Sequence, residues 1–245
     1  HLTTRRQRQM CIRDSLQRSG IGALEDINPH GIELIHELPG VGKNLQDHID
    51  FNFCFKTYDK NTLGFSPGGF LKILGEMAKW LTHGNSMISS TLSEAGGFLK
   101  TDQSLDRPDI QHHFVIGLID DHLRKLHYGY GYSCHVCLLR PYSRGTVSLA
   151  SAKYNDAPLI NPNFLNDNRD IDTLIKGAKM TQNILNTPPL KKYQKREIYG
   201  VHSNLTDREW EQHIRNRADT IYHPVGTCKM GKDPLAVVDS SLKIR

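Results

Sequence analysis

The 245-residue chain is 38% hydrophobic and 23% charged, which is typical of a globular protein with a sizeable core. Its formal net charge is +5, but residues 1–18 contain five arginines against one aspartate, so they supply +4 and leave only +1 for the rest of the chain. Because the sequence has no basic stripe interleaved with aromatic residues, we exclude nucleic-acid binding.

The two ends of the chain suggest a piece of a longer protein. The stretch RQRQMCIRDS resembles translated sequencing-adapter read-through, and we expect residues 1–15 to be a non-native or disordered tail. The first residues lack the apolar core of a signal peptide, and no apolar run approaches the roughly 20 residues that span a bilayer. The chain starts without Met and stops in an alternating apolar pattern, so we expect an incomplete fragment.

The five cysteines predict a reducing compartment, because their number is odd and the chain is too long for a disulfide scaffold. Cys134 and Cys137 form a CHVC stretch that raises the question of zinc. The surrounding residues are typical of a strand, on which positions i and i+3 face opposite sides, whereas two thiolates on one metal ion must face the same side. We therefore expect buried structural cysteines and no metal site.

Periodicity predicts the first elements of the chain. Phe51, Phe53 and Phe55 alternate with more polar residues, which indicates a half-buried strand. Residues 67–84 then place large apolar residues at helical spacing, and Gly84 is a plausible end for this helix.

The remaining elements follow the same reasoning. Residues 109–118, 131–140 and 145–151 are typical of strands. A helix that begins at Asp167 ends before Pro188, and a third helix opens with a capping box from Thr206 to Glu209. Because the strands cluster between the helices, we predict an α+β fold in which helices cover an antiparallel sheet.

The most unusual stretch near the end of the chain is YHPVGTCKMG. Pro224 disfavours the helical region for His223, so the imidazole should project from extended backbone. Histidine titrates near neutrality and can move a proton, although a structural role in a turn is an alternative. The GVG at residues 40–42 is no dinucleotide fingerprint, because it lacks the third glycine and opens no helix.

Five ordered motifs resemble the glucose–methanol–choline (GMC) oxidoreductase family, in particular its choline dehydrogenase and alcohol dehydrogenase (acceptor) branch. They are SGIG at 19–22, LPGVGKNLQDH at 38–48, EAGGF at 94–98, RPYSRGTVSLAS at 140–151 and YHPVGTCKMG at 222–231. The resemblance implies an FAD cofactor and a substrate-binding domain with remnants of a Rossmann-like FAD domain. It also implies that the main FAD-binding loop and a second active-site His or Asn lie outside this chain.

The resemblance suggests a division of the chain. We expect residues 16–50 to be a remnant of the FAD domain, 51–205 to form the substrate-binding domain and 206–245 to return toward the FAD domain.

The resemblance also assigns site residues. It implies that His223 is catalytic and handles the hydroxyl proton of an alcohol. In choline-oxidising relatives, the residue matching Asp50 is an acid that lies against the trimethylammonium group, so Asp50 is a candidate for substrate binding. A structural role at the start of the strand is equally open for Asp50, and His48 either faces the site or bonds to backbone. We expect Glu94 to be structural.

The expected function is FAD-dependent oxidation of a primary alcohol, choline-like, aliphatic or glycol, by hydride transfer to flavin N5. We expect this chain alone to be inactive. The alternatives are an FAD-containing hydroxynitrile lyase and a non-catalytic binding domain. The resemblance implies a respiratory quinone or oxygen as electron acceptor, and a cytoplasmic protein with peripheral association at the inner membrane face.

Overall fold

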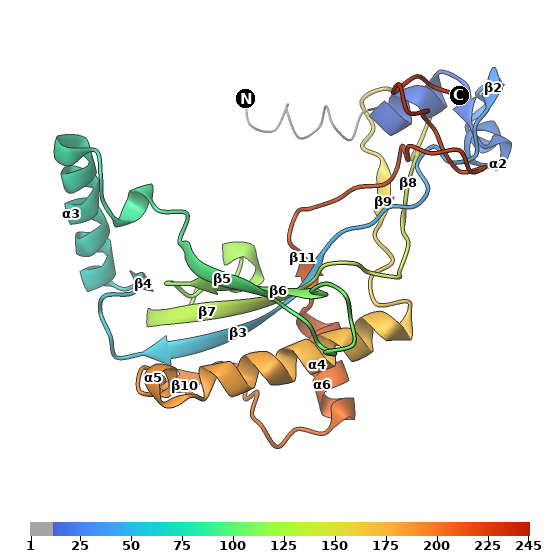
Figure 1. Cartoon of the computed structure of the whole chain (residues 1–245). Coiled ribbons are helices and arrows are strands. Elements are labelled where there is room, and N and C mark those ends of the chain that lie inside the picture. The colour runs from blue at the N-terminus through green and yellow to red at the C-terminus, as the bar shows by residue number, and fades with distance from the viewer. Residues whose placement is uncertain (1–11) are drawn as a thin grey trace. The chain divides into compact units, whose positions relative to one another are not determined.

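The computed structural model describes residues 12–245 (Figure 1). These residues form two compact units, which are described one at a time. The first unit contains the described residues up to Asp47, Pro141–Asp167 and Tyr222–Arg245, and the second contains His48–Arg140 and Asn168–Ile221. The observed units therefore place residues 141–167 with the beginning and end of the chain, and residues 206–221 with the sheet. The expected division into a remnant of an FAD domain and a substrate-binding domain stays a prediction.

The strands are mostly short. Their bounds are β1 Ile21–Gly22, β2 His36–Glu37, β3 Ile49–Thr57, β4 Gly64–Phe65, β5 Ser93–Leu99, β6 Ile110–Val115, β7 Gly129–Leu138, β8 Thr146–Ser148, β9 Leu159–Asn161, β10 Arg196–Glu197 and β11 Asp219–Thr220. The helices are α2 Leu24–Ile27, α3 Pro67–His83, α4 Asn168–Leu185, α5 Pro188–Lys191 and α6 Asp207–Arg217, with short 3₁₀ turns at η1 Asn28–His30, η2 Met87–Ser89 and η3 Asp121–Leu123.

The first unit contains little regular structure. It has two small two-stranded sheets, β1 with β2 and β8 with β9. Part of its core is a cluster of Leu38, Val41 and Val237. Residues 12–18 are helical, and Asp14 is buried and paired with Arg18 at 2.6 Å. Residues 12–15 of the expected tail are thus ordered in a helix, and residues 1–11 lie outside the described part of the chain.

The second unit is built on an antiparallel sheet. Its strands follow the order β10-β3-β7-β6-β5, with β11 also beside β3 and β4 beside β7. In the long β3–β7 pair, Phe51 lies opposite Val136 and Asp50 opposite Cys137. The predicted α+β class, an antiparallel sheet with helices, is confirmed.

Helices α4 and α6 cover one face of this sheet (Figure 1). The rings of Phe51 and Phe53 meet the Trp210 ring of α6 edge-on, with centroids 6.3 and 6.0 Å away, and all three side chains are fully buried. On α4, Gly177 lets the helix approach β7, because a Cβ there would lie only 3.0 Å from the Val136 side chain. This face is the hydrophobic core of the unit.

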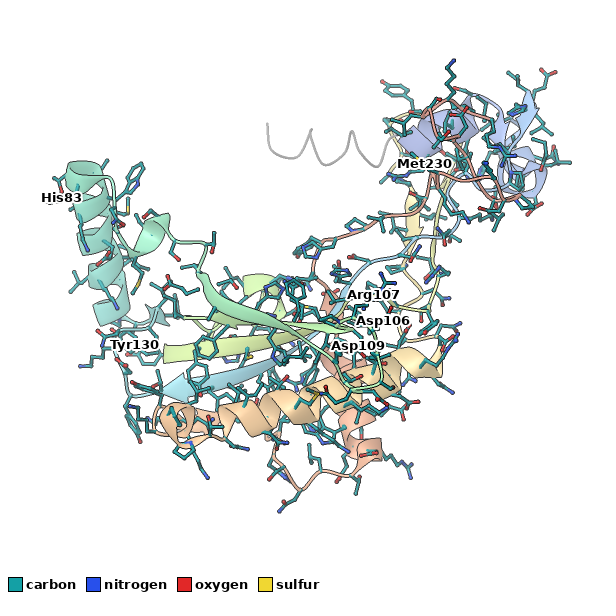
Figure 2. The ribbon with its side chains drawn as sticks, viewed as in Figure 1. His83, Asp106, Arg107, Asp109, Tyr130 and Met230 are labelled. Atoms are coloured by element: carbon teal, nitrogen blue, oxygen red, sulfur yellow. The ribbon has the colours of Figure 1, made fainter. Side chains whose placement is uncertain are left out.

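Helix α3 agrees with the predicted bounds but is packed differently from α4. Gly84 ends it in the left-handed conformation. Its polar side is tied to the unit, because Lys72 donates to the carbonyls of Lys60 and Asn61 at 2.9 and 2.7 Å. Its apolar side is open, and the Leu81 side chain is 74% exposed. His83 marks the end of α3 in Figure 2.

No helix within residues 12–245 is long and apolar enough to cross a membrane.

Candidate active site

Two of the sequence motifs lie side by side in the first unit. The backbones of Gln46 and Val225 exchange two hydrogen bonds, at 2.9 and 2.8 Å, in an antiparallel bridge. The Gly42 amide donates to the Thr227 carbonyl at 3.0 Å. The QDH loop and the histidine motif, about 180 residues apart in sequence, are therefore held together by main-chain bonds.

A third motif pairs with the same loop. Leu45 and Gly145 exchange two main-chain hydrogen bonds of 2.9 Å each, and the Val147 amide donates to the Gly42 carbonyl at 2.7 Å. With SGIG, whose Gly22 carbonyl accepts a hydrogen bond from the Leu38 amide at 3.0 Å, four of the five motifs meet within this unit. Their glycines let the backbones approach closely, a contact that no single motif reveals by itself.

Gly226 is required at its position in this arrangement. Its φ is +100°, and an added Cβ would lie 2.3 Å from the carbonyl oxygen of Asn44. The Asn44 side chain in turn donates to the Gly226 carbonyl at 3.1 Å. A larger residue would need both a disfavoured backbone conformation and movement of the neighbouring loop.

His223 lies on the exposed part of this motif. Its backbone amide donates to Oδ1 of the buried Asp47 at 2.8 Å. The preceding Tyr222 has φ = +66°, a conformation that is costly for an aromatic residue. An anchored amide and a strained neighbour together fix where the chain presents the imidazole.

The glycines at 40 and 42 offer no cradle for a pyrophosphate. A Cβ at Gly40 would lie 2.1 Å from the carbonyl oxygen of Leu235, and one at Gly42 would lie 2.1 Å from that of Val147. The close approach that each glycine permits is therefore already used by the chain's own backbone. No helix follows Gly42, so the donors that bind a dinucleotide phosphate are not found at this loop.

The second unit contains Asp50, on the sheet face that α4 and α6 leave open. Oδ2 of Asp50 accepts a hydrogen bond from Nδ1 of His135 at 2.5 Å, and Oδ1 accepts one from the Cys137 thiol at 3.4 Å. Burial alone would lower the pKa of His135, but the charge of Asp50 and its hydrogen bond raise it above the ordinary value. Burial and the same carboxylate raise the pKa of Cys137.

A hollow opens beside this pair. Its lining includes Asp50, Asn52, His135, Asp120, Asp219 and Arg217. The Arg217 guanidinium lies over the rings of Phe51 and Tyr199, 4.5 and 4.2 Å from their centroids, and burial lowers its pKa. Sequence reasoning missed His135 and Arg217. The alternation of Ser133, His135 and Cys137 along β7 was the available signal for a polar sheet face.

The other predicted residues have plainer surroundings. His48 is partly buried, and its carbonyl accepts a hydrogen bond from the Ile221 amide at 3.2 Å. Glu94 lies at a register shift between β5 and β6 and accepts a hydrogen bond from Ser90 at 2.6 Å.

The two cysteines of the CHVC stretch face opposite sides of the sheet. Cys134 pairs with Phe53 on the core face, whereas Cys137 contacts Asp50 on the other face. Within residues 12–245, no three metal-ligating side chains converge.

Comparisons with known proteins agree with the motifs. Residues 141–245 match the family model described as GMC oxidoreductase. The chain is 44% identical to an alcohol dehydrogenase [acceptor] of Pseudomonas putida over 94% of its own length and 42% of that relative. It is 35% identical to an oxygen-dependent choline dehydrogenase of Cronobacter sakazakii over 94% of its length and 41% of that relative. The chain thus spans about two fifths of these relatives.

The fold has solved counterparts. A structure of the Aspergillus oryzae formate oxidase, described for modification of its FAD, is similar with a TM-score of 0.84 at 24% identity. The match covers 95% of this chain and 45% of that one. At this identity the likeness concerns the fold. The resemblance stated from the motifs is confirmed: residues 141–245 match the GMC oxidoreductase family model, and the chain is similar to an alcohol dehydrogenase [acceptor] and to choline dehydrogenases.

Proposed function

We propose that the protein to which this chain belongs oxidises a primary alcohol with FAD as cofactor. The observation that carries the proposal is the pairing of the QDH loop with the HPVGTC motif, which anchors His223 through Asp47 and leaves it exposed. The names of the two relatives, an alcohol dehydrogenase and a choline dehydrogenase, support an alcohol as substrate.

His223 is assigned the role of proton acceptor. As an alcohol is oxidised, its hydroxyl group must lose a proton, and an imidazole near neutral pH can take it. The interaction strengthens as alkoxide character develops, so it favours the transition state over the bound alcohol. The buried Asp47 acts as a positioning residue, because it bonds the main chain of His223 and not its ring.

FAD, when bound, supplies the acceptor for the hydride. The loop at 40–42 does not fit its pyrophosphate, because neighbouring carbonyls fill the space beside both glycines. We therefore propose that other residues of the protein hold the dinucleotide. We expect that the 245-residue chain alone does not retain one FAD per protein molecule and does not oxidise alcohols.

The electron acceptor is proposed only as a class of molecule. The relatives' names, an alcohol dehydrogenase [acceptor] and an oxygen-dependent choline dehydrogenase, support an external electron acceptor, and a respiratory quinone or oxygen stays the expectation from the motif resemblance. An FAD-containing hydroxynitrile lyase is the second candidate function, and the choline-type motif order disfavours it. Anaerobic reduction of the flavin by an alcohol separates the two, because a lyase leaves the flavin oxidised.

The test replaces His223 in the FAD-loaded protein. His223→Ala should lower kcat and kcat/KM together by about 10²- to 10⁴-fold, the usual contribution of a general base, with unchanged flavin content. His223→Gln keeps a hydrogen-bonding group and should lose less. A folded, flavin-loaded His223→Ala protein that reduces its flavin within about threefold of the wild-type rate would remove His223 from the mechanism.

A further inference from the structure

The short segment that carries His223 begins and ends in left-handed backbone. Tyr222 has φ = +66° and Gly226 has φ = +100°. The left-handed region is costly for Tyr, whereas Gly adopts it as one of many conformations and so does not select it. The conformation of residues 222–226 is therefore imposed by the segment's neighbours.

The neighbour that imposes it is the loop at residues 44–47, which binds the segment at successive points. At one end, the Asp47 carboxylate accepts a hydrogen bond from the His223 amide at 2.8 Å. At the other end, Nδ2 of Asn44 donates to the Gly226 carbonyl at 3.1 Å. The main-chain bridge at Gln46 lies between these two contacts. All of these residues belong to the first unit.

Asn44 is suited to this contact in both its backbone and its side chain. Its φ is +63°, a conformation that Asn tolerates better than most residues. Its Oδ1 accepts a hydrogen bond from Nε2 of Gln46 at 3.3 Å, so both ends of the partly buried amide are engaged and its orientation is fixed. A side chain that cannot donate at this position deprives the Gly226 carbonyl of this partner.

We propose that Asn44 is a positioning residue for the oxidation of the alcohol, because its amide holds the Gly226 carbonyl and thereby fixes where the 222–226 segment presents His223. The inference rests on the proposed function, in which His223 takes the hydroxyl proton. Proton transfer requires the two heavy atoms to lie within hydrogen-bond distance, so a displaced imidazole slows the reaction without weakening the binding of the alcohol. The effect of Asn44 is indirect and passes through the main chain of the motif.

The test removes the donor of Asn44 in the FAD-loaded protein, with butan-1-ol as substrate. Asn44→Asp keeps the size and the tolerance of left-handed backbone, but its carboxylate cannot donate to the Gly226 carbonyl. We expect kcat to fall by about 10- to 100-fold, as for a misplacement of about 1 Å. The FAD content should not change, and KM should stay within about threefold of wild type. Asn44→Gly removes the donor without adding a charge and should give the same pattern.

Asn163 provides the matched control within the same unit. It also has positive φ, +53°, and its Nδ2 donates to a backbone carbonyl, that of Arg144, at 3.0 Å. That carbonyl lies outside the 222–231 motif. Asn163→Asp and Asn163→Gly should therefore keep kcat within about threefold of wild type. Equal losses at the two positions would contradict a specific role of Asn44.

The NMR signals of the His223 ring provide a readout that does not depend on turnover. They are identified by their absence in His223→Ala. They should shift or broaden in both Asn44 variants and stay unchanged in both Asn163 variants.

The outcomes separate this inference from the proposed function. If His223→Ala reduces its flavin near the wild-type rate while the Asn44 variants still change the ring signals, the proposed function is wrong and Asn44 still fixes the imidazole. If His223→Ala is slow but the Asn44 variants keep the wild-type kcat or the wild-type ring signals, Asn44 does not position His223. A loss confined to KM also contradicts the inference, because it would lie in alcohol binding and not in proton transfer.

Discussion

The two units of this chain hold their functional side chains in different ways. In the first unit, His223 is placed by main-chain bonds between loops that approach through glycines, and regular strands are few. In the second unit, Asp50 and His135 are placed by the register of two long strands whose other face is an aromatic and aliphatic core. We infer that substitutions act differently in the two units. Changes to glycine geometry should impair the first, whereas cavities in the core should impair the second.

The largest expected effect is the loss of Trp210 from the core of the second unit. Trp210 is fully buried against Phe51 and Phe53. Trp210→Ala should lower the free energy of unfolding by about 3–5 kcal/mol, because it removes a large apolar surface and leaves a cavity. Chemical denaturation of the FAD-loaded protein measures the change.

An exposed aromatic residue of the same unit is the matched control. Trp80 on α3 is 47% exposed, so Trp80→Ala should cost much less than Trp210→Ala. Equal losses for the two variants would mean that α3 is packed against a core and that the contrast between the helices is mistaken.

A smaller effect is expected in the first unit, at Gly226. Gly226→Ala requires a left-handed alanine and places its Cβ 2.3 Å from the Asn44 carbonyl oxygen. We expect a cost of about 1–3 kcal/mol from the backbone strain, together with slower flavin reduction by butan-1-ol because the loop that presents His223 must move. Stopped-flow absorbance measures the rate.

Gly84→Ala is the control that separates the cost of backbone strain from the effect of moving a neighbouring loop. Gly84 also has positive φ, +69°, but a Cβ there meets nothing within 4 Å. Gly84→Ala should lower the free energy of unfolding by about 1 kcal/mol or slightly more. It should leave the rate of flavin reduction unchanged. If Gly226→Ala keeps the wild-type rate as well, the pairing of the two loops does not position His223.

The sequence predicted element types better than packing. The periodicity of residues 67–84 and 167–185 correctly predicts two amphipathic helices, α3 and α4. The periodicity does not predict what an apolar face packs against. Of these two helices, α4 packs its apolar face on the sheet, whereas α3 leaves its apolar side exposed. Strand β3 was expected to be half-buried, but Cys54 on its polar face is fully buried as well. That burial comes from neighbours distant in sequence, such as Ile119, to which the Cys54 thiol donates.

The candidate site was predicted in part. The motifs singled out His223, Asp50 and His48, because their residue types and order are local features of the sequence. The partner of Asp50 was not predictable in this way, because His135 is 85 residues away and meets it only through the β3–β7 register. The pairing of Asp47 with the amide of His223 was missed for the same reason.

The central claim is that the His135 ring is hydrogen-bonded to the Asp50 carboxylate. It is tested most directly by an NMR titration of the His135 ring in the FAD-loaded protein and in Asp50→Asn. The pKa of His135 should lie above the ordinary value of 6.5 in the wild type and fall in Asp50→Asn, where only the lowering effect of burial remains. Since the folded-state pKa is raised, the stabilisation from this pair is complete below about pH 6.5 and is lost as the pH rises through the folded-state pKa. A wild-type pKa at or below 6.5 that Asp50→Asn leaves unchanged would contradict the account.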